Sequence, residues 1–148
     1  MSAIEGVERL LAVEEIKSLQ ARRVYAVDSQ DWDAYRSCHT EDFISYTMAD
    51  PIRGIDRVVE GLRKHLEGVR SIHQVTSPII TFTSAVEAEG VWVLRDRLWW
   101  DQDGSPHWLY GWGHYNDTYE KRGGRWLFTS RKIIRSRVET SPGARISG

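Results

Sequence analysis

The stretch from Gly90 to Arg137 constrains the fold more than any other part of the sequence. It contains three runs rich in β-branched and aromatic residues, which are separated by Asp103-Gly104 and Gly123-Gly124. Both dipeptides favour tight hairpin turns, because glycine adopts positive φ angles without steric cost. The stretch therefore predicts a meander of three antiparallel strands.

Side chains alternate in character along the first of these runs. One face of the predicted strand carries Trp92, Leu94, Asp96, Leu98 and Trp100. Asp96 is the exception on this face, because a carboxylate among large apolar side chains is costly unless something pairs with it. Two interpretations follow: an ion pair with an arginine of a neighbouring strand, or a carboxylate placed in a ligand cavity under the sheet.

The composition narrows the classes of protein to consider. The 148 residues include 20 basic and 21 acidic side chains, a balance that indicates neither a nucleic-acid partner nor an anionic membrane surface. The single cysteine, Cys38, excludes an intrachain disulfide framework and a thiolate metal cluster. The N-terminal segment lacks the features of a signal peptide, and no apolar run approaches a membrane span. We expect a cytoplasmic protein.

Periodicity divides the remainder of the chain into helices and strands. Thr40-Glu41-Asp42 is interpreted as a loop, and Pro78 as an interruption of a strand. The order of elements predicts an α+β domain over residues 1–138, with helices packed on one face of a long antiparallel sheet, and a flexible tail over 139–148. The expected elements before the meander are a helix from Ala3 that ends near Asp28, a short helix around Trp32 and Tyr35, a strand over 43–48, a helix over 55–66 and a strand over 72–82.

Three segments resemble the SnoaL-like branch of the NTF2-like superfamily: Asp28-Ser29-Gln30-Asp31-Trp32, the strand with His73, and the runs GVWVLRDRLWW and GHYNDTYEKRGGRW. The pattern is most similar to bile-acid 7α-dehydratase, with scytalone dehydratase a more distant relative. The resemblance extends to Arg135 and implies an NTF2-like cone, a strongly bent antiparallel sheet covered by about three helices around an apolar pocket. It also implies a homodimer or homotrimer formed through the outer face of the sheet, with Trp99 and Arg97 in the interface.

The resemblance also implies site residues. Asp28 matches the family's helix aspartate, His73 its strand histidine and Asp96 the aspartate of the GVWVLRD strand. The dehydratase has a tyrosine five residues before the helix aspartate, where this chain has Arg23. Tyr25, one helical turn before Asp28, is expected to replace that phenol.

The expected catalytic group is therefore His73, Asp28, Asp96 and Tyr25. His73 taken alone is more often a core or surface histidine, but two carboxylates facing the same cavity raise its significance. A carboxylate bonded to one ring nitrogen fixes the tautomer and leaves the other nitrogen as a base. The expected substrate-binding residues are Tyr46, Arg135, Tyr115 and Trp92. No H-E-x-x-H or comparable ligand spacing occurs, so neither a metal nor another cofactor is expected.

These residues favour a cofactor-independent dehydratase. Its substrate is expected to be a small apolar cyclic molecule, namely a hydroxylated cyclic ketone such as a steroid, terpenoid or polyketide. The same residues suit a ketosteroid-type isomerase or a polyketide cyclase, and the sequence does not separate these reactions. A binding module that only carries a small apolar ligand is the alternative from another class of protein.

Overall fold

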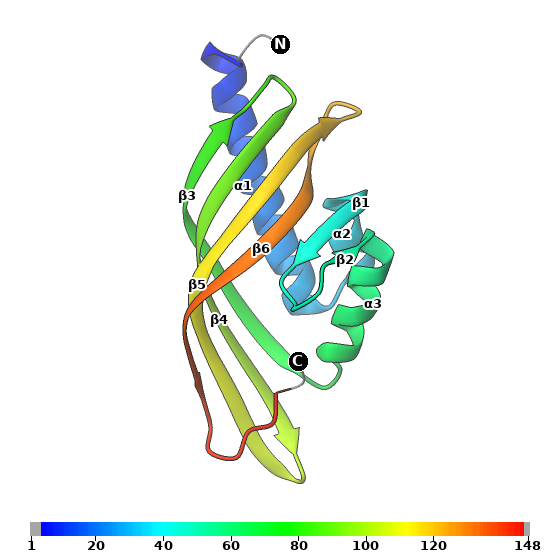
Figure 1. The fold of residues 1–148 in the computed structure, drawn as a ribbon, viewed down its shortest axis with the longest axis vertical. Coiled ribbons are helices and arrows are strands. Elements are labelled where there is room, and N and C mark those ends of the chain that lie inside the picture. Colours follow the sequence, from blue (N-terminus) through cyan, green and yellow to red (C-terminus); the bar gives the residue numbers. More distant parts are fainter. Residues whose placement is uncertain (1–3, 147–148) are drawn as a thin grey trace.

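Within residues 4–146, the computed structural model contains three helices and one six-stranded sheet (Figure 1). The sheet has the order β2-β1-β6-β5-β4-β3, and its long strands twist and bend along their length (Figure 1). This arrangement confirms the predicted α+β class. The helices are α1 (Gly6–Ser29), α2 (Trp32–Ser37) and α3 (Ile55–His65), and the strands are β1 (His39–Tyr46), β2 (Ile52–Arg53), β3 (Arg70–Phe82), β4 (Glu87–Gln102), β5 (Ser105–Arg122) and β6 (Arg125–Thr140).

The sheet differs from the prediction at its short side. Strands β3 to β6 form an antiparallel meander as expected, but β1 pairs with β6 in parallel. The backbone N–H of Phe128 donates to the carbonyl of Cys38 at 2.9 Å, so pairing begins immediately after α2. The segment Thr40-Glu41-Asp42, which was predicted as a loop, therefore belongs to β1.

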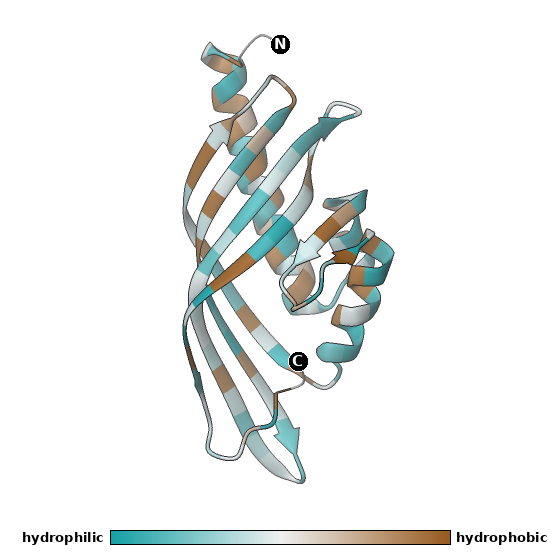
Figure 2. Ribbon diagram, viewed as in Figure 1, coloured by the Kyte–Doolittle hydropathy of each residue, from teal (hydrophilic) through white to brown (hydrophobic). Residues whose placement is uncertain are grey.

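The predicted alternation along the meander is confirmed. Trp92, Leu94 and Asp96 are buried, whereas Val91 and Arg95 between them are exposed, and bands of opposite hydropathy follow one another along the strands (Figure 2). We call the buried side, which packs against the helices, the inner face. Strand β3 continues past Pro78 through an irregularity between Thr76 and Ile79, because proline cannot donate to a ladder but is tolerated at a bulge.

Helix α1 contributes its middle and C-terminal turns to the core. Ile16, Leu19 and Val27 are buried within a cluster that includes residues from the helices and the strands. Leu10 and Leu11, near the N-terminal end of the helix, are exposed and do not belong to this core. Of the helices in residues 4–146, none combines the length and apolar character needed to cross a membrane.

The segment after Glu139 contacts the hairpin between β4 and β5, while the flexibility predicted for residues 139–148 stays a prediction. Strand β6 reaches Thr140, and the buried hydroxyl of Ser141 accepts the backbone N–H of Trp108 at 3.0 Å. The side chain of Gln102 donates to the carbonyl of Gly143 at 2.9 Å. Residues 139–146 therefore pack against the hairpin between β4 and β5, and the last two residues of the predicted tail lie outside the described range.

The outer face of the sheet carries a cluster of aromatic side chains from β4 and β5. We call Trp99, Trp108, Tyr110 and Trp112 the outer aromatic patch. The rings of Trp108 and Tyr110 stack with centroids 4.4 Å apart, and the guanidinium of Arg97 lies 5.1 Å from the Tyr110 ring centroid. All four aromatic side chains are only partly buried in one copy of the chain.

We expect the protein to form a homodimer or homotrimer that buries the outer aromatic patch, because soluble proteins rarely expose contiguous apolar surface of this kind. The measurement is the mass in solution by light scattering at micromolar concentration. Trp99→Glu should shift the mass toward the monomer, whereas Tyr25→Glu, which changes an exposed aromatic residue on α1, should not. A wild-type protein that is already a monomer contradicts the prediction.

Candidate active site

The predicted pairing of Asp28 with His73 is present in the structure. Nδ1 of His73 lies 2.6 Å from Oδ1 of Asp28, and the backbone N–H of His73 donates to Oδ2 of Asp28 at 2.9 Å. The hydroxyl of Ser71 donates to Oδ1 of Asp28 at 2.8 Å. The carboxylate thus accepts hydrogen bonds from three donors near the start of strand β3.

The end of α1 is fixed to the start of β3 by Gln30. This residue caps the helix in the left-handed conformation, with φ of 55°. Its side-chain amide donates to the carbonyls of Leu66 at 2.9 Å and Val69 at 3.0 Å. The last helical turn, which carries Asp28, therefore cannot slide along the strand that carries His73.

Hydrogen bonding sets the charge of the Asp28 carboxylate. Burial alone raises its pKa, but hydrogen bonds from the His73 ring and backbone and from Ser71 outweigh burial and hold the pKa below the ordinary value of 3.8. An ionised carboxylate only accepts, so Nδ1 of His73 carries the proton.

The second ring nitrogen of His73 is available to a ligand. The side chain is 12% exposed. Nε2 forms no hydrogen bond with the described residues, and the surrounding atoms do not enclose it completely. With the proton on Nδ1, Nε2 presents a lone pair, which is the arrangement that a general base requires.

Asp96 lies beside His73 and holds an arginine. His73 and Asp96 are opposed residues of β3 and β4. Both carboxylate oxygens of Asp96 accept from Arg135, with Oδ1 2.5 Å from Nη1 and Oδ2 2.8 Å from Nη2. The ion-pair interpretation of Asp96 is confirmed, although its partner comes from β6, one strand beyond the neighbouring β5.

Gly111 makes this long reach possible. It occupies the position on β5 opposite Asp96, and a Cβ atom placed there would overlap Oδ1 of Asp96 and Nη1 of Arg135. The missing side chain therefore leaves the path across β5 open. This role of Gly111 is not apparent from the sequence alone.

A second, fully buried ion pair was also missed. Nε and Nη2 of Arg131 donate to the two carboxylate oxygens of Asp117 at 2.7 and 2.8 Å. Gln20 from α1 bridges both partners: Arg131 donates to its Oε1 at 2.7 Å, and its Nε2 donates to Asp117 at 3.0 Å. Although burial lowers it, this network raises the pKa of Arg131, so the guanidinium stays charged in the core.

Two of the expected substrate-binding residues are built into this interior. Nε1 of Trp92 donates to the hydroxyl of Tyr119 at 2.7 Å, and Tyr119 in turn contacts Asp117 at 3.2 Å. Tyr115 is buried, with the guanidinium of Arg131 3.6 Å from its ring centroid.

Two other tyrosines are placed away from His73. Tyr25 is 76% exposed, so the prediction that it shares the face of Asp28 is wrong. Tyr46 is 40% exposed and is opposed to Lys132, whereas its buried neighbour Ser45 is opposed to Arg131. Neither phenol is directed toward the inner face in one copy of the chain.

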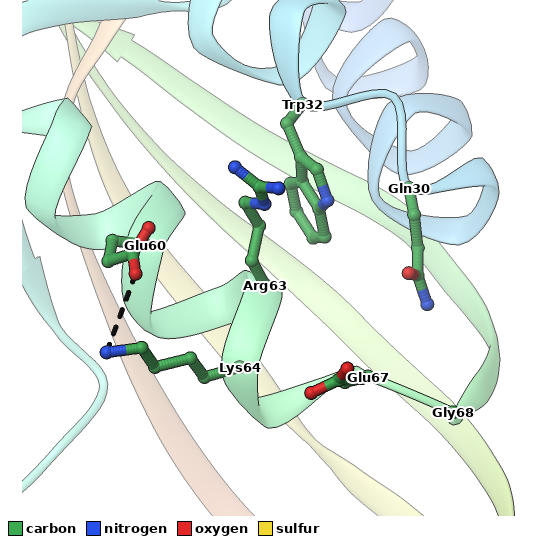
Figure 3. A pocket seen from close by; sticks show the side chains of 7 residues that line it. All are labelled: Gln30, Trp32, Glu60, Arg63, Lys64, Glu67 and Gly68. Carbon is green, nitrogen blue, oxygen red and sulfur yellow. Dashed lines mark ion pairs between the residues drawn. The ribbon is translucent and has the colours of Figure 1, made fainter.

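Two open pockets flank the end of α1. One of about 600 Å³ reaches Asp28 and Ser71 and is bounded by Trp99. The other, of about 430 Å³, lies between the end of α1 and α3 and is lined by Gln30, Trp32, Glu60, Arg63, Lys64, Glu67 and Gly68 (Figure 3). Its lining contains an ion pair between Lys64 and Glu60 at 3.5 Å (Figure 3). Of the two pockets, only the larger one is lined by a member of the His73–Asp28 pair, namely Asp28.

Comparison with known proteins identifies the family of the chain. The family described as the SnoaL-like domain matches residues 8–132. The chain belongs to the SnoaL-like family. No curated protein matches it in sequence. The resemblance predicted from the sequence is thereby confirmed at the level of the family, while the closer similarity to bile-acid 7α-dehydratase stays a prediction.

Solved structures confirm the NTF2-like cone. A hexachlorocyclohexane dehydrochlorinase (LinA) shares a TM-score of 0.82 at 17% identity, over 96% of this chain and 97% of that one. A putative scytalone dehydratase from Novosphingobium aromaticivorans shares 0.78 at 22% identity, over 89% of each chain. A protein of unknown function from Mycobacterium tuberculosis shares 0.76 at 25% identity, over 92% of this chain and 79% of that one. Structural neighbours of this SnoaL-like protein thus include lyase-type enzymes.

Gly111→Ala tests the path between Asp96 and Arg135. We expect it to lower the free energy of unfolding by about 1–3 kcal/mol, because the added methyl group displaces one partner of a buried ion pair. Gly61→Ala is the control, since Gly61 lies within α3 and a Cβ there meets nothing within 4 Å. It should raise the same quantity by about 0.4–1 kcal/mol. Equal urea midpoints for Gly111→Ala and wild type contradict the role of Gly111.

The lowered pKa of Asp28 predicts a pH dependence of stability. A carboxyl whose pKa is lower in the folded state contributes stability above its unfolded pKa, and this contribution is lost as the pH falls through the folded value. Asp28→Asn should therefore melt below wild type near neutral pH, and the difference should shrink as the pH falls below 3.8. Thermal melts of both proteins over a pH series make the comparison. A difference that does not change with pH refutes the assignment.

Proposed function

We propose that this protein is a cofactor-independent lyase that removes water from a hydroxylated cyclic ketone. The observation that carries the proposal is the His73–Asp28 pair, with Nδ1 bonded to Oδ1 at 2.6 Å and Nε2 left open. An imidazole whose Nδ1 is fixed by a carboxylate and whose Nε2 is open is suited to abstracting a proton next to a carbonyl group. The substrate is expected to be a steroid, terpenoid or polyketide.

The elimination uses one proton twice. Nε2 of His73 takes the proton from the carbon next to the carbonyl, and the electron pair left behind forms an enolate. Asp28 stabilises the resulting imidazolium through Nδ1–H. The enolate then expels the hydroxyl from the neighbouring carbon, and the imidazolium returns its proton to that oxygen, so that water leaves and a double bond forms.

Asp96 and Arg135 act beside the base. Asp28 already occupies Nδ1 of His73, so orientation of the ring does not require Asp96. Asp96 instead fixes Arg135 next to His73, with the Arg135 side chain 33% exposed. In this proposal a guanidinium N–H of Arg135 contacts the substrate carbonyl and stabilises the enolate.

The structural neighbours support elimination as the type of reaction. One neighbour is named as a dehydrochlorinase and another as a putative scytalone dehydratase, names that denote removal of hydrogen chloride and of water respectively. Both reactions require a base placed against a carbon-bound proton. The same base also suits a ketosteroid-type isomerase or a polyketide cyclase, and a non-catalytic module for small apolar ligands is the remaining alternative.

Substitutions at His73 and Asp28 separate catalysis from structure. We expect Asp28→Asn to lower turnover by about 100- to 10,000-fold, because an amide permits the wrong tautomer and does not stabilise imidazolium. His73→Ala should lose at least as much, and the double variant little more, since the two residues act as one unit. Turnover is measured on hydroxylated cyclic ketones and on a chlorinated cyclohexane, with the melting temperature of each variant.

His114→Ala is the matched control, because His114 is exposed on the outer face of β5. It should retain full turnover. If His73→Ala retains the wild-type turnover per folded molecule, the lyase proposal is wrong. If no member of the panel is turned over but the wild type binds these ketones and His73→Ala binds them equally well, the binding module becomes the better assignment.

A further inference from the structure

Arg23 is a buried cation for which residues 4–146 supply no carboxylate partner. It is 7% exposed, and its one hydrogen bond runs from Nη2 to the hydroxyl of Tyr35 at 3.1 Å. Nε and Nη1 are enclosed and make no hydrogen bond within the described part of the chain. Arginine does not lose its proton in proteins, so this charge persists in the core.

The aromatic neighbours of Arg23 compensate only part of its charge. The guanidinium carbon lies 5.1 Å from the ring centroid of Tyr35 and 5.5 Å from that of Tyr115. Contacts of this kind contribute about 0.5–2 kcal/mol, whereas a buried charge without hydrogen bonds costs considerably more. Among the described residues, the Arg23 guanidinium therefore lacks a negative partner, and its Nε and Nη1 lack hydrogen-bond acceptors.

Arg131 packs against the same Tyr115 ring and also has a nitrogen without a hydrogen-bond partner. Its guanidinium carbon is 3.6 Å from the centroid of Tyr115, and Asp117 and Gln20 occupy Nε and Nη2 but leave Nη1 enclosed without a partner. Asp117 neutralises one of the two arginines. The group formed by Arg23, Arg131 and Asp117 consequently carries one excess positive charge.

His39 does not correct this imbalance. Its Nδ1 bonds the carbonyl of Tyr35 at 2.7 Å. Burial, together with the charges of Arg23 and Arg131, lowers its pKa well below the ordinary value of 6.5, so the imidazole is neutral. The arginines therefore keep the positive charge, and an acceptor with negative charge is the missing component.

We propose that Arg23 and the free edge of Arg131 bind the anionic oxygen group of a ligand, namely a carboxylate or an ionised enol or phenol. The substrate of the site therefore carries such a group. This inference builds on the proposed lyase, because it describes the substrate of the same site. Arg23 and Asp28 lie five residues apart on α1, which corresponds to about 7.5 Å along the helix axis.

The location explains a departure from the dehydratase pattern. Arg23 stands where the bile-acid 7α-dehydratase pattern has a tyrosine, five residues before the helix aspartate. A phenol donates one hydrogen bond to a neutral oxygen, whereas a guanidinium offers several donors and a charge. A guanidinium at this position therefore favours an anionic oxygen over a neutral one.

The test compares benzoate with benzamide, which have the same shape but differ in charge. Titration calorimetry should show that wild type binds benzoate more tightly than benzamide. Arg23→Met should bind benzoate about 10- to 100-fold more weakly, because a charge-assisted hydrogen bond is lost, with benzamide little changed. Arg23→Lys should recover part of the benzoate affinity, and Arg22→Met, the exposed neighbour on α1, should match wild type.

Equal affinity for the two probes in wild type, or equal benzoate affinity in wild type and Arg23→Met, overturns the proposal. A crystal structure of wild type grown with benzoate gives an independent measure if Arg23→Met does not fold. Carboxylate density within hydrogen-bond distance of Arg23 supports the proposal, and ordered water alone at both arginines refutes it. Because these readouts measure binding, a failed turnover assay leaves them interpretable.

Discussion

The docking of α1 against the inner face of the sheet is the contact on which the remainder of the structure depends. Three polar side chains along the helix bond to the sheet: Glu15, Gln20 and Asp28. Each meets a different strand, since their partners belong to β6, β5 and β3. Three attachments at different heights fix both the rotation of the helix about its axis and its position along the sheet. Apolar packing alone fixes these less sharply, because it is non-directional.

Burial of charge sets the second constraint. Asp117 and Asp96 each lie on the inner face, where a carboxylate requires several donors. Arg131 reaches Asp117 directly from the adjacent strand, whereas Arg135 reaches Asp96 only because β5 has a glycine at position 111. One ion pair therefore stabilises the closed part of the core. The other crosses β5, joins Arg135 to the residue opposite His73 and keeps a cation at the site.

The sequence predicts the parts of this arrangement that follow from local pattern. Alternation along β4 identifies Asp96 as the polar residue of an apolar face, and the resemblance to a known family pairs Asp28 with His73. Long-range pairing is not encoded locally, so the parallel pairing of β1 with β6 was not predicted. A register shift places Arg135 opposite Gly113 but Arg137 opposite Trp112. Plain alternation along the strand would place Arg135 and Arg137 on one face, but the extra residue at this shift reverses the direction of the side chains beyond it.

The incomplete polar groups of the core mark the functional region more clearly than the complete ones. Both carboxylate oxygens of Asp117 and of Asp96 accept hydrogen bonds from arginine, so these two side chains need no ligand to satisfy them. Nε2 of His73 makes no hydrogen bond with the described residues, and Nε and Nη1 of Arg23 are enclosed without a partner. Unpaired buried donors cost about 1–3 kcal/mol each, and a structure under selection for stability alone would replace Arg23 with an apolar side chain. Arg23 lies on α1, and His73 lies on β3, which Asp28 of α1 contacts. This is the arrangement expected when one ligand binds both the base and the unpaired cation.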